Sequence, residues 1–456
     1  MRRIPRWAHP ARPLTAAAAA VLLAAGCTSA PPDGGPGTLG TAGEPVTIRV
    51  LANDAFAKQW QDKLVPEFRE KYPHIKVQVD GLPYADQLPK TMLDLTGTEP
   101  TYDIVLADDP WIPRMAETGG LVDLKKGLRR YTEKGYDWAD FSPSPLAAGE
   151  ADGHQYAVPV RTNLMLMFYN KALYKKAGVA EPSERTTWKQ YLKDARKLDQ
   201  DTDGDGKKDS WTVGTYFTKD PLTPTIWQSV LNADGGHLLD SEQRVTFNNA
   251  KGVKALQTQI DLLKHAPPGA SSYQFNEPLE AFRQGKTATM FMWGSVYKGT
   301  AVDKTSTKLS PEDVGITTMP AGSAGPSTHR GVWSAAVAKK SPHQAAAWKF
   351  LQWTTSKKGE RWAGAHLGSF PARRSTLEGT PPASWLGPVY EAIKKGDKAV
   401  QAGKMYRPRL PESDAIQQIL SLQTSRAMSG ETSAKDALAT AEKNIDTLLQ
   451  AKGYGR

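Results

Sequence analysis

The stretch that decides the fold opens with Val46-Thr47-Ile48-Arg49-Val50-Leu51, a run of β-branched and aliphatic residues. Such a run predicts a β-strand. Directly after it, large apolar side chains recur every four residues and so share one helix face: Phe56, Trp60, Leu64, Phe68 and Tyr72. We expect Pro66 to kink this helix and Tyr72-Pro73 to end it.

The same alternation continues to residue 106. Ile75, Val77 and Val79 alternate as a second strand. Residues 87–95 then predict a second helix, and Ile104-Val105-Leu106 a short third strand. A β-α-β-α-β order predicts parallel strands joined by right-handed crossovers. We therefore expect an α/β fold in which helices flank a mostly parallel sheet.

Polar and aromatic residues follow the first and third of these strands. Asn53-Asp54 comes after the first strand, and Asp108-Asp109-Pro110-Trp111 comes after the third. Open α/β sheets bind ligands beyond the carboxyl ends of their strands, where the loops leave the sheet. The two loops should therefore share one rim.

A second α/β set occupies the rest of the chain. It begins with a strand in the apolar run from Met165 to Tyr169. Further strands are predicted at 212–215, 288–293 and 331–337, and helices at 187–198, 224–232 and 250–265. Two helices close the chain, one capped by Asp414 and one by the pair Ser433 and Asp436.

The N-terminal segment has the layout of an export signal. Four arginines and no acidic residue precede an apolar run from Leu14 to Ala25, and Cys27, the one cysteine of the chain, follows it. The run is short of the roughly 20 residues that cross a bilayer. It resembles a bacterial lipoprotein signal, in which Cys27 would be acylated, for example with palmitate, and Ala24 stands where such signals prefer Leu. An ordinary cleaved signal with a bystander cysteine is the alternative.

The segment after Cys27 predicts a flexible tether. Residues 28–44 are almost all Thr, Ser, Ala, Pro, Gly and Asp, which supply too few large apolar groups to pack. As a coil this segment should span roughly 20 to 25 Å. The folded part would then lie just outside the membrane that holds the acylated cysteine.

Composition narrows the function classes. The chain has a formal charge of +10 and 39% hydrophobic residues, enough for one large or two moderate cores. No Lys/Arg block is interleaved with aromatic residues as in a nucleic-acid groove, so the positive charge predicts a solvated basic surface. Without paired cysteines, the cores must stabilise the folded chain.

Several stretches in a fixed order carry a resemblance to a known family. They run from about residue 45 to 450. The matching stretches include Tyr102-Asp103-Ile104-Val105, Tyr156-Ala157-Val158-Pro159, Ala233-Asp234-Gly235-Gly236, Ala281-Phe282-Arg283-Gln284-Gly285-Lys286, Gly331-Val332-Trp333 and Ala345-Ala346-Ala347-Trp348. Together they resemble family 1 of the extracellular solute-binding proteins of bacterial ABC importers, which includes sugar-binding lipoproteins.

The resemblance implies a type II two-lobed architecture with the ligand cleft between the lobes. After the signal (1–27) and the tether (28–44), lobe 1 would comprise residues 45–160 and 290–336, and lobe 2 residues 161–289 and 337–456. Crossing segments are expected near Val160 to Asn163, Gly285 to Met290 and Trp333 to Ala338. The protein would be a monomer that captures a carbohydrate, expected to be an oligosaccharide, and delivers it to the permease subunits of an ABC transporter, without a required cofactor.

Residues expected at the cleft combine flat rings with polar side chains. A sugar stacks its C–H patches on aromatic rings and needs hydrogen-bond partners for its hydroxyls. Asp108 or Asp109 would accept hydrogen bonds from paired hydroxyls, and Asn163 matches a ligand-contacting polar residue of the family. Arg161 is a weaker candidate than Asn163. The remaining predicted ligand residues are Asn53, Trp111, Trp227, Trp293, Trp333 and Arg373, although core packing is the commoner role of a single Trp.

One loop has the spacing of a calcium site. Asp201, Asp203, Asp205 and Asp209, with Gly206, reproduce most of an EF-hand loop. The twelfth position, normally a bidentate Glu, is Thr212, which predicts weak affinity. A structural calcium ion is one interpretation, and a solvated Asp-Gly turn is the other.

An anchored glycosidase is the main rival interpretation. Glycoside hydrolysis needs two carboxylates on either side of the scissile bond. Asp108 and Asp109 are adjacent and point in different directions, so they are a poor pair. The sequence has no Gly-x-Ser-x-Gly elbow, His-Glu-x-x-His or phosphate-binding glycine loop, and its histidines are scattered. A surface adhesin is disfavoured because nothing repeats.

Overall fold

A mixed sheet of eight strands organises the protein, and the order of its strands is β2-β1-β3-β12-β6-β8-β7, with β9 also paired to β6. The computed structural model describes residues 37–201, 204–206, 208–219, 222–401 and 408–454. The strands are β1 (Val46–Asn53), β2 (Ile75–Leu82), β3 (Ile104–Asp108), β6 (Ala157–Asn170), β7 (Trp211–Gly214), β8 (Thr287–Trp293), β9 (Val314–Thr317) and β12 (Arg330–Val337). Two short hairpin pairs lie outside this sheet, β4 (Glu150–Ala151) with β5 (His154–Gln155), and β10 (Ala321–Gly322) with β11 (Gly325–Pro326).

The predicted β-α-β-α-β unit is confirmed. β1 pairs in parallel with β2 and with β3. The helix after β1 is continuous but changes form: α1 (Asp54–Gln59) passes through a π-helical turn (Trp60–Leu64) into α2 (Val65–Lys71). The wider turn stands directly before Pro66, whose ring displaces the hydrogen bond of the preceding turn. Tyr72 ends α2, as predicted, and α3 (Tyr84–Thr96) connects β2 to β3.

Helices cover both faces of this part of the sheet. Ile48 and Val50 of β1 pack with Phe56, Trp60 and Phe68, whereas Leu51 packs on the opposite face with residues of α3 and α4 (Ile112–Glu117). This alternation is what a strand buried on both sides requires. We call the part of the chain that forms these two clusters lobe 1. It also contains α5 (Pro143–Ala147), α11 (Gln344–Thr354) and α12 (Lys357–Leu367).

A separate, larger cluster forms lobe 2. It gathers Met165 to Phe168 of β6, β8, and apolar residues of the surrounding helices. These helices are α7 (Trp188–Leu198), α8 (Pro224–Ala233), α9 (Ala250–Leu263), α10 (Asn276–Arg283), α14 (Gly387–Gln401), α15 (Ser413–Met428) and α16 (Ala434–Ala451), with the short α6 (Lys171–Lys176) beside a small satellite cluster. The predicted helices at 187–198, 224–232 and 250–265 are confirmed.

The two C-terminal helices differ at their caps. Ser433 caps α16 as predicted, because its hydroxyl accepts a hydrogen bond from the N–H of Asp436 at 3.1 Å. The predicted cap at Asp414 is wrong, since α15 already begins at Ser413 and Asp414 lies in its first turn. A carboxylate in the first turn still interacts favourably with the positive end of the helix dipole.

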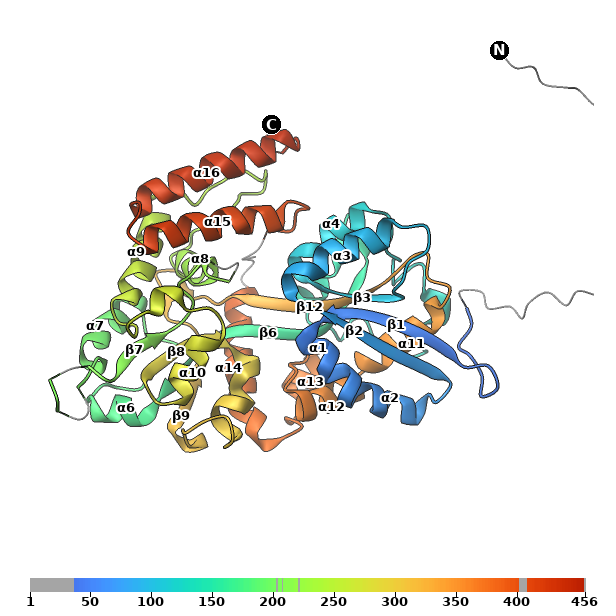
Figure 1. The fold of residues 1–456 in the computed structure, drawn as a ribbon, viewed down its shortest axis with the longest axis horizontal. Coiled ribbons are helices and arrows are strands. Elements are labelled where there is room, and N and C mark those ends of the chain that lie inside the picture. Colours follow the sequence, from blue (N-terminus) through green and yellow to red (C-terminus); the bar gives the residue numbers. More distant parts are fainter. Residues whose placement is uncertain (1–36, 202–203, 207, 220–221, 402–407, 455–456) are drawn as a thin grey trace, which may run out of the picture. The chain divides into compact units, whose positions relative to one another are not determined.

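Two long strands connect the lobes (Figure 1). The first half of β6 pairs with β12, and its second half pairs with β8 and β9. Val158 therefore belongs to the core of lobe 1, and Leu164 to that of lobe 2. β12 begins at Arg330, which pairs with Leu164 of β6, and ends at Val337, which pairs with Ile104 of β3. Two of the predicted crossings, near 160–163 and 333–338, lie on these strands.

The third predicted crossing is wrong. Phe282 and Met290, on either side of Gly285, both pack in the core of lobe 2. The chain passes from lobe 1 to lobe 2 instead between α12 and α14. Phe370 already packs in the core of lobe 2, Ala372 packs again in that of lobe 1, and Leu377 packs in lobe 2. Phe370 forms an isolated bridge with Thr162 of β6, so this crossing lies beside the first one.

The predicted lobe boundaries also need correction. The sequence predicts that residues 290–336 belong to lobe 1, yet Met290 to Trp293 and Met319 pack in the core of lobe 2. It also predicts that residues 337–456 belong to lobe 2, yet Trp348 and Phe350 pack in lobe 1. The physical reason is the pairing of β8. This strand pairs with the second half of β6, which lies in lobe 2, so the chain returns to lobe 1 only at β12.

In the part of the chain that the structure describes, no helix is both long and apolar enough to cross a membrane. The predicted signal, the acylation site Cys27 and the start of the tether fall within residues 1–36, outside the described residues.

Candidate functional site

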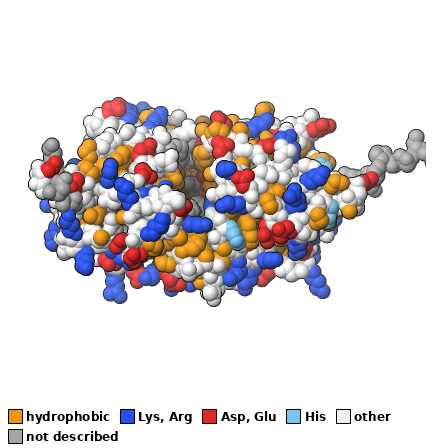
Figure 2. Space-filling view, turned by 60° about the horizontal axis from the view of Figure 1, so that its bottom comes forward, with side chains coloured by type: hydrophobic (Ala, Val, Ile, Leu, Met, Phe, Trp, Pro, Cys, Tyr) orange, Lys and Arg blue, Asp and Glu red, His pale blue; other side chains and the backbone are white. Residues whose placement is uncertain are grey.

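A cavity of about 330 Å³ lies where β6 and β12 pass between the lobes. Its volume is at the lower end of the range for small-molecule sites, roughly 300 to 1,000 Å³. Figure 2 shows the molecule hollowed near the middle of the face presented, with basic and acidic side chains mixed around it. The residues that line the cavity are Tyr84, Asp108, Arg161, Asn163, Leu222, Phe275, Trp293, Ser295, Gly331 and Trp333.

Asp108 supplies a buried carboxylate at the carboxyl end of β3. The hydroxyl of Tyr84 donates to its Oδ2 at 2.9 Å, and the N–H of Asp109 donates to its Oδ1 at 3.1 Å. The donors of the carboxylate thus include one from the start of α3 and one from its own loop. A carboxylate oxygen can accept more than one hydrogen bond, so this arrangement orients Asp108 for paired donors of a ligand.

Asn163 of β6 is fixed by the turn that follows β8. Its Nδ2 donates to the hydroxyl of Ser295 at 2.8 Å, and its Oδ1 accepts from the N–H of Ser295 at 3.2 Å. Both residues line the cavity. The reciprocal pair sets the amide orientation, so that the cavity presents a donor and an acceptor of known position.

The walls of the cavity are aromatic. The ring of Trp333 lies 5.1 Å from Phe56 and 5.8 Å from Trp111, which support it from behind. On the other side, Trp293 approaches the backbone of Gly331 so closely that a Cβ there would lie 3.1 Å from the indole ring. Glycine is therefore what allows the indole to lie against β12 at this point.

Arg161 also lines the cavity, and few contacts of its guanidinium are found among the described residues. Its Nη2 donates to the carbonyl of Leu367 at 3.2 Å, and its guanidinium lies 4.9 Å from the ring centre of Phe56. Burial lowers the pKa of Arg161 to about 10, so the side chain is still charged at neutral pH.

Three predicted ligand residues lie outside the cavity lining. Trp111 is buried behind Trp333 and Tyr84. Asn53 caps α1, since its Oδ1 accepts from the N–H of Phe56 at 3.0 Å. Asp109 begins the turn after β3, and its charge partly opposes the burial that lowers the pKa of Arg409.

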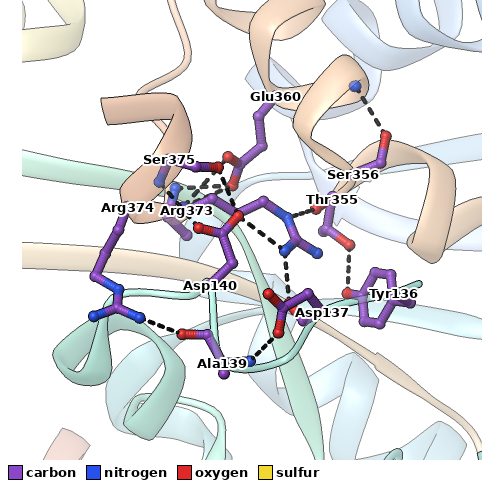
Figure 3. Close-up of polar contacts among 12 residues, drawn as sticks. Tyr136, Asp137, Ala139, Asp140, Thr355, Ser356, Glu360, Arg373, Arg374 and Ser375 are labelled. Atoms are coloured by element: carbon purple, nitrogen blue, oxygen red, sulfur yellow. Dashed lines mark hydrogen bonds and ion pairs between the residues drawn. The ribbon is translucent and has the colours of Figure 1, made fainter. Parts of the chain in front are cut away.

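Two other predicted ligand residues, Trp227 and Arg373, are core residues and not part of the cavity lining. Trp227 is fully buried in lobe 2, where its Nε1 donates to the carbonyl of Gly252 at 3.0 Å. Arg373 is buried in lobe 1, where it donates to the carbonyls of Thr355 at 2.6 Å and Asp137 at 2.7 Å (Figure 3). Neither residue lines the cavity, so packing and local hydrogen bonds account for both.

The sequence interpretation missed several lining residues. Tyr84 follows β2, so the rim rule that selected the loops after β1 and β3 would have found it. The other residues, Leu222, Phe275, Ser295 and Gly331, carry no distinguishing local signal. They reach the cavity through tertiary packing of lobe 2 and β12.

The predicted calcium loop stays a prediction. Asp203 lies outside the described residues, whereas Asp201, Asp205 and Asp209 are described. Asp201 accepts from the N–H of Gly204 and of Gly206. Among the described residues, no group of three or more His, Cys, Asp or Glu side chains is placed to hold a metal ion.

Comparison with known proteins places this architecture in a family. The family model of the bacterial extracellular solute-binding proteins matches residues 53–361, more than half of the chain. The chain belongs to this family. The match begins at the end of β1 and includes all ten lining residues named above and both crossing strands.

Individual relatives are distant in sequence but cover most of the chain. A mannitol-binding protein of Pseudomonas aeruginosa is 26% identical over 350 residues, which are 70% of this chain and 75% of the relative. A probable amino-acid ABC transporter periplasmic-binding protein of Sinorhizobium fredii is 23% identical over 413 residues, 89% of this chain and 90% of the relative. A solved ABC transporter solute-binding protein of Agrobacterium radiobacter K84 in complex with ribitol has a TM-score of 0.76 and 28% identity, and the match covers 89% of this chain and 100% of that one. The predicted two-lobed α/β fold is thus confirmed.

Proposed function

We propose that this solute-binding protein captures a polyhydroxylated small molecule, a sugar or polyol, between its lobes and delivers it to an ABC importer. The observation that carries the proposal is the composition of one cavity. Asp108 and Asn163 lie beside the indoles of Trp293 and Trp333 at the crossing strands. Rings that stack on C–H patches and oriented polar groups that bind hydroxyls are what such a ligand needs.

The ligands for which the relatives are named support this chemistry without deciding it. Mannitol and ribitol are polyols, whereas the Sinorhizobium relative is named for amino acids. The small cavity favours a ligand of one or two sugar units over the longer oligosaccharide expected from the sequence.

The site favours binding over catalysis. Among the described residues that line the cavity, Asp108 is the one carboxylate. A glycosidase needs a second carboxylate about 5 Å or roughly 6.5 to 9.5 Å away. The relatives compared above are binding proteins. We therefore propose that the protein releases its ligand unchanged.

Calorimetric titration of the purified chain with a panel of sugars, polyols and amino acids tests the proposal. We expect saturable binding of at least one carbohydrate and its recovery intact by chromatography. Trp333→Ala should weaken that binding by about 10-fold or more, because it removes a stacking wall. Trp362→Ala removes a half-buried indole outside the cavity and serves as the control. Binding of amino acids alone, or turnover of the sugar, would refute the proposal.

We further propose that acylation of Cys27 holds the protein at the outer face of the cell membrane. The apolar run that ends before the cysteine and the linker-like composition of residues 28–44 support this. In cells fed labelled palmitate, the native chain should take up label and sediment with membranes, whereas Cys27→Ser should do neither. Membrane association of the unlabelled variant would contradict acylation as the anchor.

A further inference from the structure

We propose that the ligand carries a carboxylate and that Arg161 receives it, which makes a monomeric sugar acid, such as a uronate or an aldonate, the preferred solute. This inference rests on the proposed function and names the ligand class of the same cavity. It starts from the unusual position of Arg161, a cation in the wall of a site whose other polar side chains suit a neutral ligand.

Arg161 is half-buried, and its guanidinium has little to offset the desolvation. A guanidinium has five N–H donors, and the contact found for Arg161 in the described residues is one hydrogen bond to the carbonyl of Leu367. Its Nε is buried and has no hydrogen-bond partner there. The ring of Phe56 covers one face. The cation therefore keeps donors for something that is not part of the described chain.

The described residues also provide no counter-ion. No ion pair is found between Arg161 and any described carboxylate, although the structure pairs many other cations. Burial alone accounts for the lowered pKa of Arg161, without an opposing contribution from Asp108 or another acid. A buried charge without a partner is unfavourable, and a ligand carboxylate would remove that penalty through two parallel hydrogen bonds.

The rest of the cavity fixes how such a ligand would lie. Asp108 repels a carboxylate and suits hydroxyl donors, so the acid group should lie at Arg161 and the hydroxyls at Asp108 and Asn163. Trp293 and Trp333 then face the carbon skeleton. A monomeric sugar acid supplies a carboxylate at one end and hydroxyls along the rest of a short chain or ring.

Matched ligand pairs test the inference by calorimetry on the native chain. The pairs are D-glucuronate with D-glucose, D-galacturonate with D-galactose, and D-gluconate with D-glucitol, and D-glucuronamide serves as an uncharged analogue. We expect at least one acid to bind about 10-fold or more tightly than its neutral partner and its binding to weaken with added salt. Glucose 6-phosphate distinguishes a carboxylate site from a general anion site.

Variants connect the preference to Arg161. Arg161→Gln should abolish the preference for the acid, and Arg161→Lys should retain part of it because the charge remains. Arg130→Gln, which removes an exposed arginine of lobe 1, is the matched control and should bind like the native chain. Circular dichroism of each variant verifies folding, and the native ligand pairs decide the question if a variant does not fold.

The outcomes separate this inference from the proposed function. Neutral sugars or polyols that bind as tightly as their acids would overturn the inference and leave the proposed function standing. A preference that survives Arg161→Gln, or stronger binding of the phosphate than of every carboxylate, would also overturn it. If no carbohydrate of the panel binds, the proposed function fails and the inference fails with it.

Discussion

Arg373 and Arg161 lie near neighbouring crossings between the lobes, yet their surroundings are opposite. Arg373 donates to two backbone carbonyls and to Asp140, and its guanidinium lies over the rings of Phe141 at 4.1 Å and Tyr136 at 5.0 Å. Among the described residues, Arg161 donates to one backbone carbonyl and its guanidinium lies beside one aromatic ring. Since an arginine has five donors, the difference lies in how many of them the fold itself uses.

The comparison separates a structural cation from one available to a ligand. Around Arg373, Glu360 accepts the backbone N–H groups of Ala372 and Arg373, and Ser375 donates to Asp140 (Figure 3). Burial alone would raise the pKa of Asp140, but the hydrogen bonds from Ser375 and Arg373 hold it below its usual value. This cluster holds the third crossing against lobe 1. Among the described residues, no comparable network of hydrogen bonds and ion pairs surrounds Arg161.

The largest expected effect is the loss of the Arg373 cation. Arg373→Met keeps much of the side-chain volume but leaves Glu360 and Asp140 without their positive partner. Breaking a buried charge network in this way typically costs about 3 to 5 kcal/mol. Chemical denaturation should therefore show a large decrease in the free energy of unfolding.

The neighbouring arginine provides the control for this change. Arg374 is exposed and donates to the carbonyl of Ala139 at 2.7 Å. Arg374→Met should lower the free energy of unfolding by less than about 1 kcal/mol. Equal losses for Arg373→Met and Arg374→Met would mean that the buried cluster contributes no special stability.

Glu360 makes the same cluster sensitive to pH. Burial raises its pKa to about 7, although the N–H groups of Ala372 and Arg373 and the charge of Arg373 act in the opposite direction. The other titratable groups that interact with it, Tyr136 and Tyr390, have pKa values far above the neutral range because they are buried. Glu360 is thus the group of this cluster that titrates near neutral pH.

The sign of the effect follows from proton binding. Between the unfolded pKa of about 4.5 and the folded pKa of about 7, the folded state binds the proton and the unfolded state does not. This contribution to stability is complete below pH 4.5, decreases as the pH rises and is lost above about pH 7. Its full size is up to roughly 3 kcal/mol.

Glu360→Gln tests this dependence, because glutamine does not titrate. The difference in unfolding free energy between the native chain and the variant should change with pH between about 4.5 and 7 and be constant above. Glu70→Gln, at an exposed position of α2, should show no such change. A pH-independent difference for Glu360→Gln would place the pKa of Glu360 at its ordinary value.

Local sequence patterns predict the sheet and the rim but not which side chains face the cavity. The β-α-β-α-β unit follows from apolar spacing, and strand ends indicated the loop of Asp108. The neighbouring Trp111, on the same loop, turns inward behind Trp333. Whether an indole faces a cleft or a core depends on rings from distant parts of the chain, as with Phe56 and Tyr84.

The burial of Arg373 in lobe 1 could not be predicted from the local sequence either. Its partners include Asp137, 236 residues earlier, and Asp140, 233 residues earlier. No local pattern indicates that these groups meet. The lobe boundaries were wrong for a related reason, because the choice of β6 as the partner of β8 is made by long-range pairing and not by chain order.

The smallest expected change in unfolding free energy is that of a substitution at Arg161. Arg161→Met removes the charge of a half-buried side chain that no described carboxylate offsets, and it keeps an apolar side chain against Phe56. Whereas Arg373→Met should destabilise the protein strongly, Arg161→Met should leave the unfolding free energy unchanged or raise it by about 0.5 to 2 kcal/mol. Arg49→Met, which breaks the ion pair between Arg49 of β1 and Asp80 of β2, is the control for an arginine that has a partner.

A loss above about 2 kcal/mol for Arg161→Met would show that its cation is structural, like that of Arg373. A saturating sugar acid should raise the unfolding free energy of the native chain more than that of Arg161→Met, because the variant has lost the partner of the ligand carboxylate.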